Sequence, residues 1–323
     1  MHKRIFMLGA IAAAATLAAS AALAQSFPSK PITIIVPFAA GSGTDQQARA
    51  FAQAITAEYK VPVVVDDKAG ASGFIASQYV AKAAPDGYTV LMTTNTTHAA
   101  NEHLFKKLPY DPVKDFTPVA LLSKGHMLLL VQPSSPIKSV GDLVAAAKKN
   151  PGKLNFGSGS SSSRVASEML KQMAGVEMTN VPYKSNPNAV TDLLGGQIDM
   201  MITDTATGIP QIKGGKLRAL GVSTTHRIDL LPDVPTIDEA GVKGYDMGYW
   251  FAAYVPAGTP PAVVSRLREL LVAGTKSAAA KTFYASTGTE AWTTASTDEL
   301  ARFQAAEAQK WGRVIKAAGI EPE

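Results

Sequence analysis

Two short segments rich in glycine and hydroxyl side chains have the composition of an anion-binding turn. The first is Phe38-Ala39-Ala40-Gly41-Ser42-Gly43-Thr44-Asp45. Its glycines permit a tight turn in which several backbone N–H groups point at one place, and a helix N-terminus behind it adds about half a positive charge. The segment therefore predicts a cradle for a carboxylate or a phosphate. The alternative is an ordinary turn in which Thr44 or Asp45 only caps the helix.

The second segment runs from Gly157 to Arg164 and includes Ser158, Gly159, Ser160, Ser161 and Ser162. Its hydroxyl groups and backbone N–H groups are hydrogen-bond donors, although a flexible serine-rich surface loop is the alternative. Arg164 is a candidate partner for a second acidic group, because a guanidinium binds a carboxylate through two parallel hydrogen bonds; otherwise it lies on the outer face of its helix. Asp204 follows a predicted strand, where it either orients a ligand or caps a helix.

Signatures of catalysis and of metal binding are missing. Neither glycine turn completes G-x-G-x-x-G, because Gln46 and Ser162 occupy the sixth positions, and no G-x-x-x-x-G-K-[ST] or G-x-S-x-G occurs. The chain has no cysteine, and its histidines form no H-E-x-x-H frame, so we assign them surface or core roles. The sequence therefore predicts no catalytic residue, no metal and no cofactor.

The elements that must position these turns alternate between strand and helix. Strands are predicted at 32–36, 61–65, 89–93, 119–122 and 127–131, with helices at 46–59 and 73–83. The alternation restarts with helices at 140–149, 164–173 and 190–194, strands at 154–156, 200–202 and 217–223, and helices at 261–273 and 297–317. This order predicts two α/β lobes, each presenting one turn to a shared cleft. Lobe I comprises residues 25–125 plus 247–323, and lobe II comprises 126–246.

The first residues read as a secretory leader. Lys3 and Arg4 precede an apolar run without acidic residues, and Ala22-Leu23-Ala24 matches a signal peptidase site, so residues 1–24 are predicted to be a signal peptide. Without cysteine the protein is not a lipoprotein. The formal charge is +5, and removing the two leader cations leaves 5 − 2 = +3, scattered along the chain. We expect a monomer free in the periplasm, with no membrane anchor and no nucleic-acid partner.

Short segments along the chain occur in an order that is typical of one known family: Lys30-Pro31-Ile32, Ile35-Val36-Pro37-Phe38-Ala39-Ala40-Gly41, Leu108-Pro109-Tyr110-Asp111-Pro112, Asp115-Phe116-Thr117-Pro118-Val119, Pro182-Tyr183-Lys184, Leu193-Leu194-Gly195-Gly196-Gln197-Ile198-Asp199, Gly215-Lys216-Leu217-Arg218-Ala219-Leu220, Asp233-Val234-Pro235-Thr236 and Pro256-Ala257-Gly258-Thr259-Pro260. These segments give the sequence a resemblance to the Bug-type receptors of tripartite tricarboxylate transporters. It implies a Venus-flytrap periplasmic binding protein that closes on a small di- or tricarboxylate, aliphatic or aromatic, and presents it to membrane permease subunits.

The resemblance also implies binding residues. Phe38 to Asp45 would hold a ligand carboxylate through backbone N–H groups and water, with Thr94 and Asn95 as a further contact in lobe I. Lobe II would contribute Ser158 to Ser162, the turn Tyr183-Lys184-Ser185, and Asp204. The chain departs from the family pattern at Ser42, at Ser185-Asn186 and at Arg164. Two alternatives stay open: a periplasmic ligand sensor that signals to a kinase, and an exported α/β hydrolase.

Overall fold

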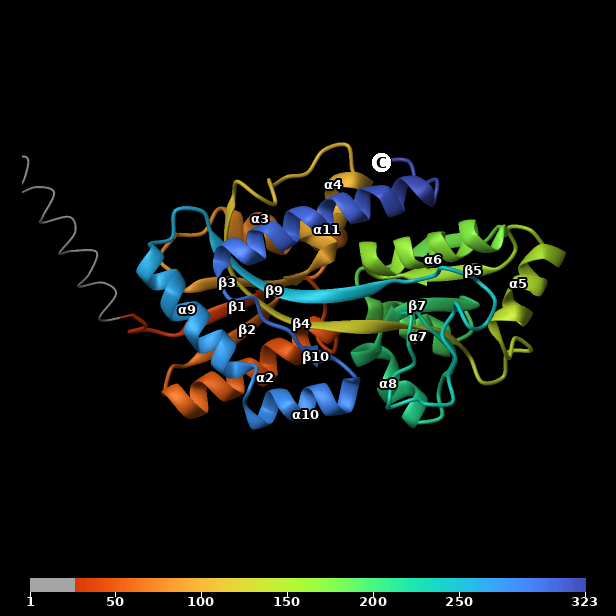
Figure 1. Ribbon diagram of the computed structural model, residues 1–323, viewed down its shortest axis with the longest axis horizontal. Helices are drawn as coiled ribbons and strands as arrows, with labels where there is room; N and C mark the ends of the chain where they lie inside the picture. Colours follow the sequence, from red (N-terminus) through yellow and green to blue (C-terminus); the bar gives the residue numbers. More distant parts are fainter. Residues whose placement is uncertain (1–26) are drawn as a thin grey trace, which may run out of the picture.

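The protein forms two α/β lobes, described here for residues 27–323 of a computed structural model (Figure 1). The sheet of the first lobe has the strand order β2-β1-β3-β9-β4, with β10 paired to β4. Its strands are β1 (Ile32–Val36), β2 (Val63–Asp67), β3 (Thr89–Thr94), β9 (Gly248–Pro256), β10 (Glu290–Ala291) and the first part of β4 (Phe116–Val131). β1 is parallel to both β2 and β3, and its β-branched residues are mostly buried, as expected of a parallel strand covered on both faces.

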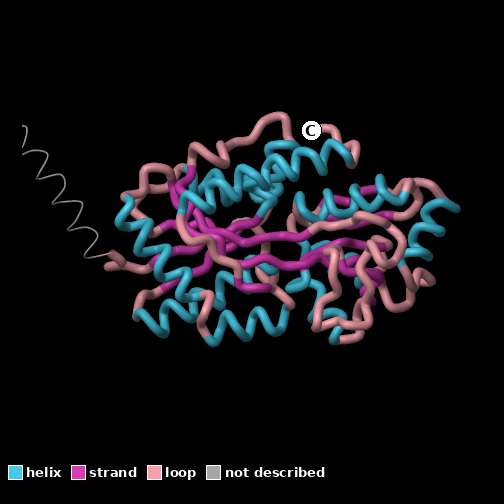
Figure 2. The backbone as a smooth tube through the Cα atoms, in the orientation of Figure 1, coloured by secondary structure: helices cyan, strands magenta, loops and turns pink. Residues whose placement is uncertain are grey.

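The second lobe repeats this arrangement with the remainder of β4. Its sheet continues in the order β4-β7-β5-β6, with β8 also paired to β4. The strands are β5 (Asn155–Ser158), β6 (Thr179–Pro182), β7 (Met200–Asp204) and β8 (Arg218–Val222). They alternate with α5 (Val140–Lys149), α6 (Ser161–Ala174), α7 (Asn186–Leu194) and α8 (Thr205–Lys213). Figure 2 shows these helices around the strands of the second lobe.

The long strand β4 joins the lobes. It pairs with β9 as far as His126 opposite Gly248, and from Met127 opposite Asp204 it pairs with β7. The change of partner therefore falls between His126 and Met127, while the chain returns to the first lobe at Gly248. These positions agree with the lobe boundaries at 125/126 and 246/247, which stay a prediction.

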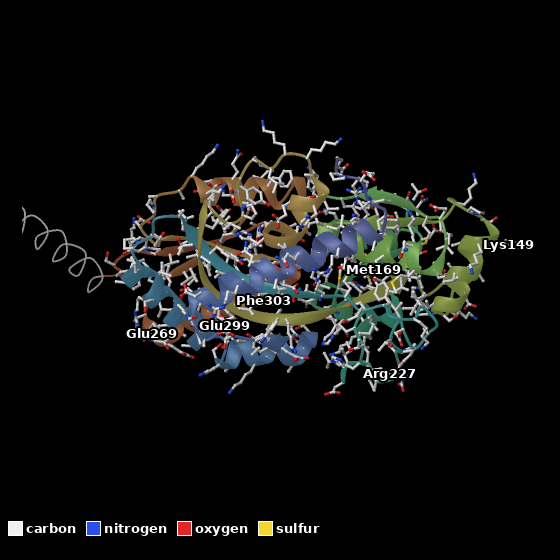
Figure 3. All side chains as sticks on the ribbon, turned by 45° about the horizontal axis from the view of Figure 1, so that its top comes forward. Lys149, Met169, Arg227, Glu269, Glu299 and Phe303 are labelled. Atoms are coloured by element: carbon white, nitrogen blue, oxygen red, sulfur yellow. The ribbon has the colours of Figure 1, made fainter. Side chains whose placement is uncertain are left out.

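Most helices of the first lobe follow its strands. They are α2 (Gly43–Tyr59), η1 (Ala71–Gly73), α3 (Phe74–Ala81), the π-helical turn η2 (Thr96–Ala100), α4 (Asn101–Leu104), α9 (Pro261–Gly274) and α10 (Ala278–Thr287). The last helix, α11 (Thr297–Ala317), contacts η2 and β4 and also reaches α6 of the second lobe. Figure 3 shows α11 crossing the molecule, with Phe303 on it. Within residues 27–323 we find no helix with the length and apolarity needed to span a bilayer.

The structure confirms the α/β fold and corrects several element boundaries. The helices at 140–149 and 297–317 have the predicted bounds, whereas α2 and α6 begin at Gly43 and Ser161, three residues earlier than predicted. The strands predicted at 119–122 and 127–131 are one strand, β4. The elements that were not predicted include α4, β6, α8, β9, α10 and β10. Glycine and serine in the first turns concealed the true helix starts, because these residues have weak helix propensity. The predicted signal peptide lies outside the described residues.

Candidate functional site

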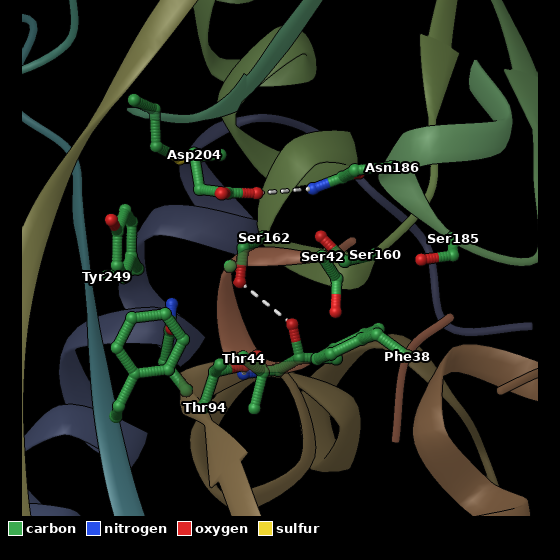
Figure 4. Close-up of a pocket in the computed structure, with 15 residues that line it drawn as sticks. Phe38, Ser42, Thr44, Thr94, Ser160, Ser162, Ser185, Asn186, Asp204 and Tyr249 are labelled. Atoms are coloured by element: carbon green, nitrogen blue, oxygen red, sulfur yellow. Dashed lines mark hydrogen bonds between the residues drawn. The ribbon is translucent and has the colours of Figure 1, made fainter. Parts of the chain in front are cut away.

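A pocket between the lobes lies where β1, β3, β5 and β7 end (Figure 4). Its space amounts to about 390 Å³, including the part open to solvent. Its walls are mostly small polar side chains with a few apolar ones: Phe38, Ser42, Gly43, Thr44, Thr94, Asn95, Thr96, Met127, Ser160, Ser162, Ser185, Asn186, Asp204, Tyr249 and Phe251. The location follows the rule that open α/β sheets bind ligands at the carboxyl ends of their strands.

Four helices begin at this pocket. Gly43 and Thr44 are the first residues of α2, while Ser160, Ser185 and Asp204 are the N-caps of α6, α7 and α8. The N–H groups of a first turn have no acceptor within their own helix, and each N-terminus carries about half a positive charge. No lysine or arginine is among the lining residues. The pocket is therefore suited to an anion that is held by N–H and hydroxyl groups rather than by a cation.

The first glycine turn owes its shape to its own side chains. Ser42 caps α2 by accepting a hydrogen bond from the Asp45 N–H at 3.3 Å, and Asp45 accepts one from the Gly41 N–H at 2.8 Å. Gly41 has a φ of +82°, a conformation that L-residues other than glycine rarely adopt. Asp45 is buried and forms an ion pair with Arg49 at 2.6 Å. Asp45 thus stabilises the turn, and Ser42 rather than Thr44 or Asp45 is the cap.

Hydrogen bonds across the pocket join the lobes. The Ala39 N–H donates to Ser185 Oγ at 3.2 Å, and Gln46 Nε2 donates to the Ala206 carbonyl at 3.2 Å. Thr96 Oγ1 and Ser162 Oγ lie 2.9 Å apart, as the dashed line in Figure 4 marks. The turn before α2 therefore contacts the N-terminal end of α7, and the first turn of α2 contacts that of α8, which is the closed arrangement of the lobes.

Asn95 brings a polar side chain to the pocket that makes no hydrogen bond to any described residue. It is fully buried at the end of β3, yet neither its amide oxygen nor its amide nitrogen has a hydrogen-bond partner among the described residues. A buried amide without partners costs about 1–3 kcal/mol, so such a group usually meets a ligand or a water molecule. Asn95 is therefore available to a bound molecule as both donor and acceptor.

Asp204 serves the structure and also lines the pocket. Its Oδ1 accepts hydrogen bonds from the N–H and hydroxyl of Thr207 at 2.8 and 2.9 Å, which caps α8. Its Oδ2 accepts one from Asn186 Nδ2 at 3.1 Å (Figure 4). Because donors surround this carboxylate, the pocket tolerates its negative charge beside an anion.

The sequence matches the family described as the tripartite tricarboxylate transporter family receptor over residues 47–320. The chain belongs to this family. The receptor is similar in structure to the periplasmic binding protein BugD, with 33% identity, a TM-score of 0.88, and coverage of 92% of this chain and 100% of that chain. The R. palustris protein Rpa4515 with adipate has 36% identity, a TM-score of 0.88 and the same coverage. MatC from Rhodopseudomonas palustris with bound malate has 31% identity and a TM-score of 0.84, covering 90% and 100%.

The structure brings about half of the predicted binding residues to the pocket. Those that line it are Phe38, Ser42, Gly43, Thr44, Thr94, Asn95, Ser160, Ser162, Ser185 and Asp204. Those that do not line it are Ala39, Ala40, Gly41, Asp45, Ser158, Gly159, Ser161, Arg164, Tyr183 and Lys184.

Most residues of the second group have partners elsewhere in the receptor. Ser158 donates to Asn180 at 2.7 Å, Ser161 donates to Asn101 at 2.6 Å, and the Tyr183 hydroxyl donates to Asp192 at 2.8 Å. Lys184 is exposed. Arg164 forms an ion pair with Glu323 at the C-terminus, so we do not assign it to the ligand.

The receptor's pocket also contains residues that the sequence did not indicate as ligand contacts: Thr96, Met127, Asn186, Tyr249 and Phe251. Trp250, the neighbour of Tyr249, does not line the pocket, and its indole N–H donates to Glu307 at 3.0 Å. The Tyr249 hydroxyl lies 3.2 Å from Thr205 Oγ1 and 3.1 Å from Thr289 Oγ1. Burial, together with the charge of Asp204, raises the pKa of Tyr249, so its hydroxyl stays protonated at the pocket wall.

Proposed function

We propose that this receptor captures a small dicarboxylate in the periplasm for a tripartite tricarboxylate-type uptake transporter. The observation that carries the proposal is the convergence of four helix N-termini on a pocket without lysine or arginine. Adipate and malate, found in the two R. palustris complexes, each carry two carboxylates. One carboxylate of the ligand meets α2 in the first lobe, and the other meets α6 and α7 in the second.

The proposal includes no chemical reaction. The serines at the pocket, Ser42, Ser160, Ser162 and Ser185, become nucleophiles only beside a general base. No histidine or lysine is among the lining residues, and Asp204 is occupied by hydrogen bonds to Thr207 and Asn186. The polar groups of the pocket can therefore bind and release a ligand as the lobes close and open.

The location and the partners follow from the same proposal. A periplasmic receptor needs export, which the predicted leader at residues 1–24 provides. The ligand then passes to membrane permease subunits, which recognise the closed lobes. Closure alters the relative position of surfaces on both lobes, so a permease can distinguish loaded from empty receptor.

Calorimetry with matched acids tests the proposal. We expect adipate or malate to bind, and we expect adipate to bind more tightly than hexanoate, which has the same chain length and a single carboxylate. Losing the second carboxylate leaves the first-turn N–H groups of α6 and α7 without a charged acceptor, which costs about 1.5–3 kcal/mol. Equal affinities for adipate and hexanoate, or no binding of any diacid tested, would exclude a dicarboxylate site.

Replacing Asn95 tests how the pocket holds its ligand. Asn95→Leu keeps the size of the side chain but removes both of its hydrogen-bonding atoms. Because these atoms have no hydrogen-bond partner in the part of the chain that the structure describes, we expect little loss of folding stability and a loss of about 1–3 kcal/mol in the free energy of diacid binding. The control is Asn150→Leu, at an exposed position at the end of α5, which should keep wild-type affinity. Unchanged affinity in Asn95→Leu would remove Asn95 from the site.

A further inference from the structure

A second group of side chains meets where the lobes join. His126 lies in β4, His226 follows β8, and Glu290 lies in β10, so these residues are far apart in the sequence. In the structure one ring nitrogen of each histidine and one carboxylate oxygen of Glu290 all lie within 4.8 Å of one another. His126 is buried, whereas His226 and Glu290 are exposed to solvent. The sequence did not predict this cluster, because the two histidines stand a hundred residues apart.

Hydrogen bonds orient the His126 ring. Its Nδ1 lies 2.8 Å from Thr224 Oγ1, and Thr224 donates its hydroxyl proton to the His226 carbonyl at 3.2 Å. Thr224 must therefore accept a hydrogen bond from Nδ1–H, which leaves the Nε2 atom of neutral His126 with a lone pair. This arrangement matches metal-binding histidines, whose second ring nitrogen donates to a fixed acceptor.

The lone pair of His126 faces a carboxylate. His126 Nε2 lies 3.5 Å from Glu290 Oε1, so two acceptors meet unless a positive charge lies between them. A metal ion coordinated by both atoms would supply that charge. Lys124 Nζ contacts the other oxygen, Oε2, at 3.1 Å and leaves Oε1 directed at His126.

We propose that His126, His226 and Glu290 bind a divalent transition-metal ion of the Zn²⁺ class. Two imidazoles and one carboxylate are a common ligand set for Zn²⁺, with water in the remaining position. A Zn²⁺ ion with ligand distances of about 2.0–2.2 Å requires the three ligand atoms to come closer together than in this structure. The side chains that would move are those of His226 and Glu290, which are exposed. Lys124 beside Glu290 weakens the site but does not block it, because it contacts the other carboxylate oxygen.

The position of the site connects it to both lobes. Glu290 belongs to β10 of the first lobe, His226 lies in the second lobe, and His126 is the last residue of β4 that pairs with β9. The adjacent residue Thr289 bonds to Tyr249 of the ligand pocket at 3.1 Å. A bound ion therefore links the two lobes beside His126 and Met127, where β4 passes from the first sheet to the second.

Titration of tag-free protein with ZnCl₂ in competition with a chromophoric chelator tests the site. We expect the wild type to bind one Zn²⁺ per chain. In His226→Ala and in Glu290→Gln, the affinity for Zn²⁺ should fall at least about 10–100-fold, because losing even a residue that only orients a ligand usually has an effect of this size. Both residues are exposed, so these variants should fold normally. Thr224→Val removes the hydrogen bond that orients the His126 ring, so the affinity for Zn²⁺ should fall about 10–100-fold. Replacing Zn²⁺ by Co²⁺ should give visible bands of a site with nitrogen and oxygen ligands.

The matched control is His103→Ala, because His103 is also a partly exposed histidine near a glutamate, with its Nε2 3.9 Å from Glu102. Among residues 27–323 this pair forms no cluster with a second histidine, so this variant should bind Zn²⁺ as the wild type does. Absence of stoichiometric binding in the wild type would overturn the proposal, and so would equal affinity in the wild type, His226→Ala and Glu290→Gln. Neither outcome bears on the carboxylate site, since the diacid titrations are made without added metal.

Discussion

Gly43→Val is expected to abolish diacid binding while the protein stays folded. A Cβ on Gly43 would lie 2.6 Å from Asp204 Oδ1 and 3.2 Å from the Ala206 Cβ, both in the second lobe. Hydrogen bonds from Thr207 hold Asp204 in place, so it cannot move aside cheaply. Gly43 is required by this close approach between the lobes and not by its backbone conformation, since its φ is not in the left-handed region. The substitution should therefore prevent closure.

The expected loss exceeds about 3 kcal/mol, the upper end of ordinary overpacking penalties, and corresponds to more than about 100-fold in affinity. Folding stability should change little, because the clash disappears when the lobes open. Calorimetry measures the affinity, and small-angle scattering with saturating diacid should show compaction of the wild type but not of the variant.

Gly141→Val is the matched control for this substitution. Gly141 is also in the first turn of a helix, α5, but a Cβ there would lie 3.6 Å from its nearest neighbour, an ordinary contact. This variant should bind and close like the wild type. If Gly43→Val bound diacid with normal affinity, the turn would not approach the second lobe as closely as the structure indicates.

Local periodicity predicted most of the fold. The helices 140–149 and 297–317 have the predicted bounds because capping serines, Ser139 and Ser296, precede regular apolar patterns. The starts of α2 and α6 were missed because Gly43 and Ser161 to Ser163 are typical of turns. The sequence predicted two strands in place of β4 because Gly125 interrupts the apolar pattern. In the structure Gly125 pairs with Tyr249 of β9. Pairing across the sheet, not local propensity, makes this strand continuous.

The composition of the pocket was only partly predictable. Turns that follow strands were visible in the sequence, and Ser160 and Asp204 are in the pocket for that reason. Met127 and Phe251 lie within strands, where the sequence cannot show which face meets the other lobe. Arg164 was a reasonable partner for an anion, but its pairing with Glu323 depends on where α11 places the C-terminus. Contacts between segments that are distant in the sequence cannot be predicted from the spacing of residues along the chain.

His98 should make the folded state sensitive to acid. It is fully buried, stacked 3.9 Å from the Tyr254 ring, with Nδ1 2.8 Å from Thr97 Oγ1 and no partner at Nε2 among the described residues. Burial lowers the pKa of His98 from 6.5 to about 3. Below about pH 6.5 the unfolded chain therefore binds a proton that the folded protein does not, so stability falls as the pH falls towards about 3.

His98→Phe should remove this contribution, because it keeps an aromatic ring beside Tyr254 and cannot titrate. Between about pH 7 and about pH 5, the free energy of unfolding of the wild type should fall by about 2 kcal/mol more than that of the variant. Asp67 acts in the opposite direction, since burial, with the charge of Asp45, raises its pKa to about 6, but both proteins contain Asp67 and the comparison cancels it. Urea unfolding without ligand at several pH values measures the difference. The same pH slope in both proteins would mean that His98 gains a proton in the folded state as readily as in the unfolded chain, and that its buried contacts do not exclude the charge.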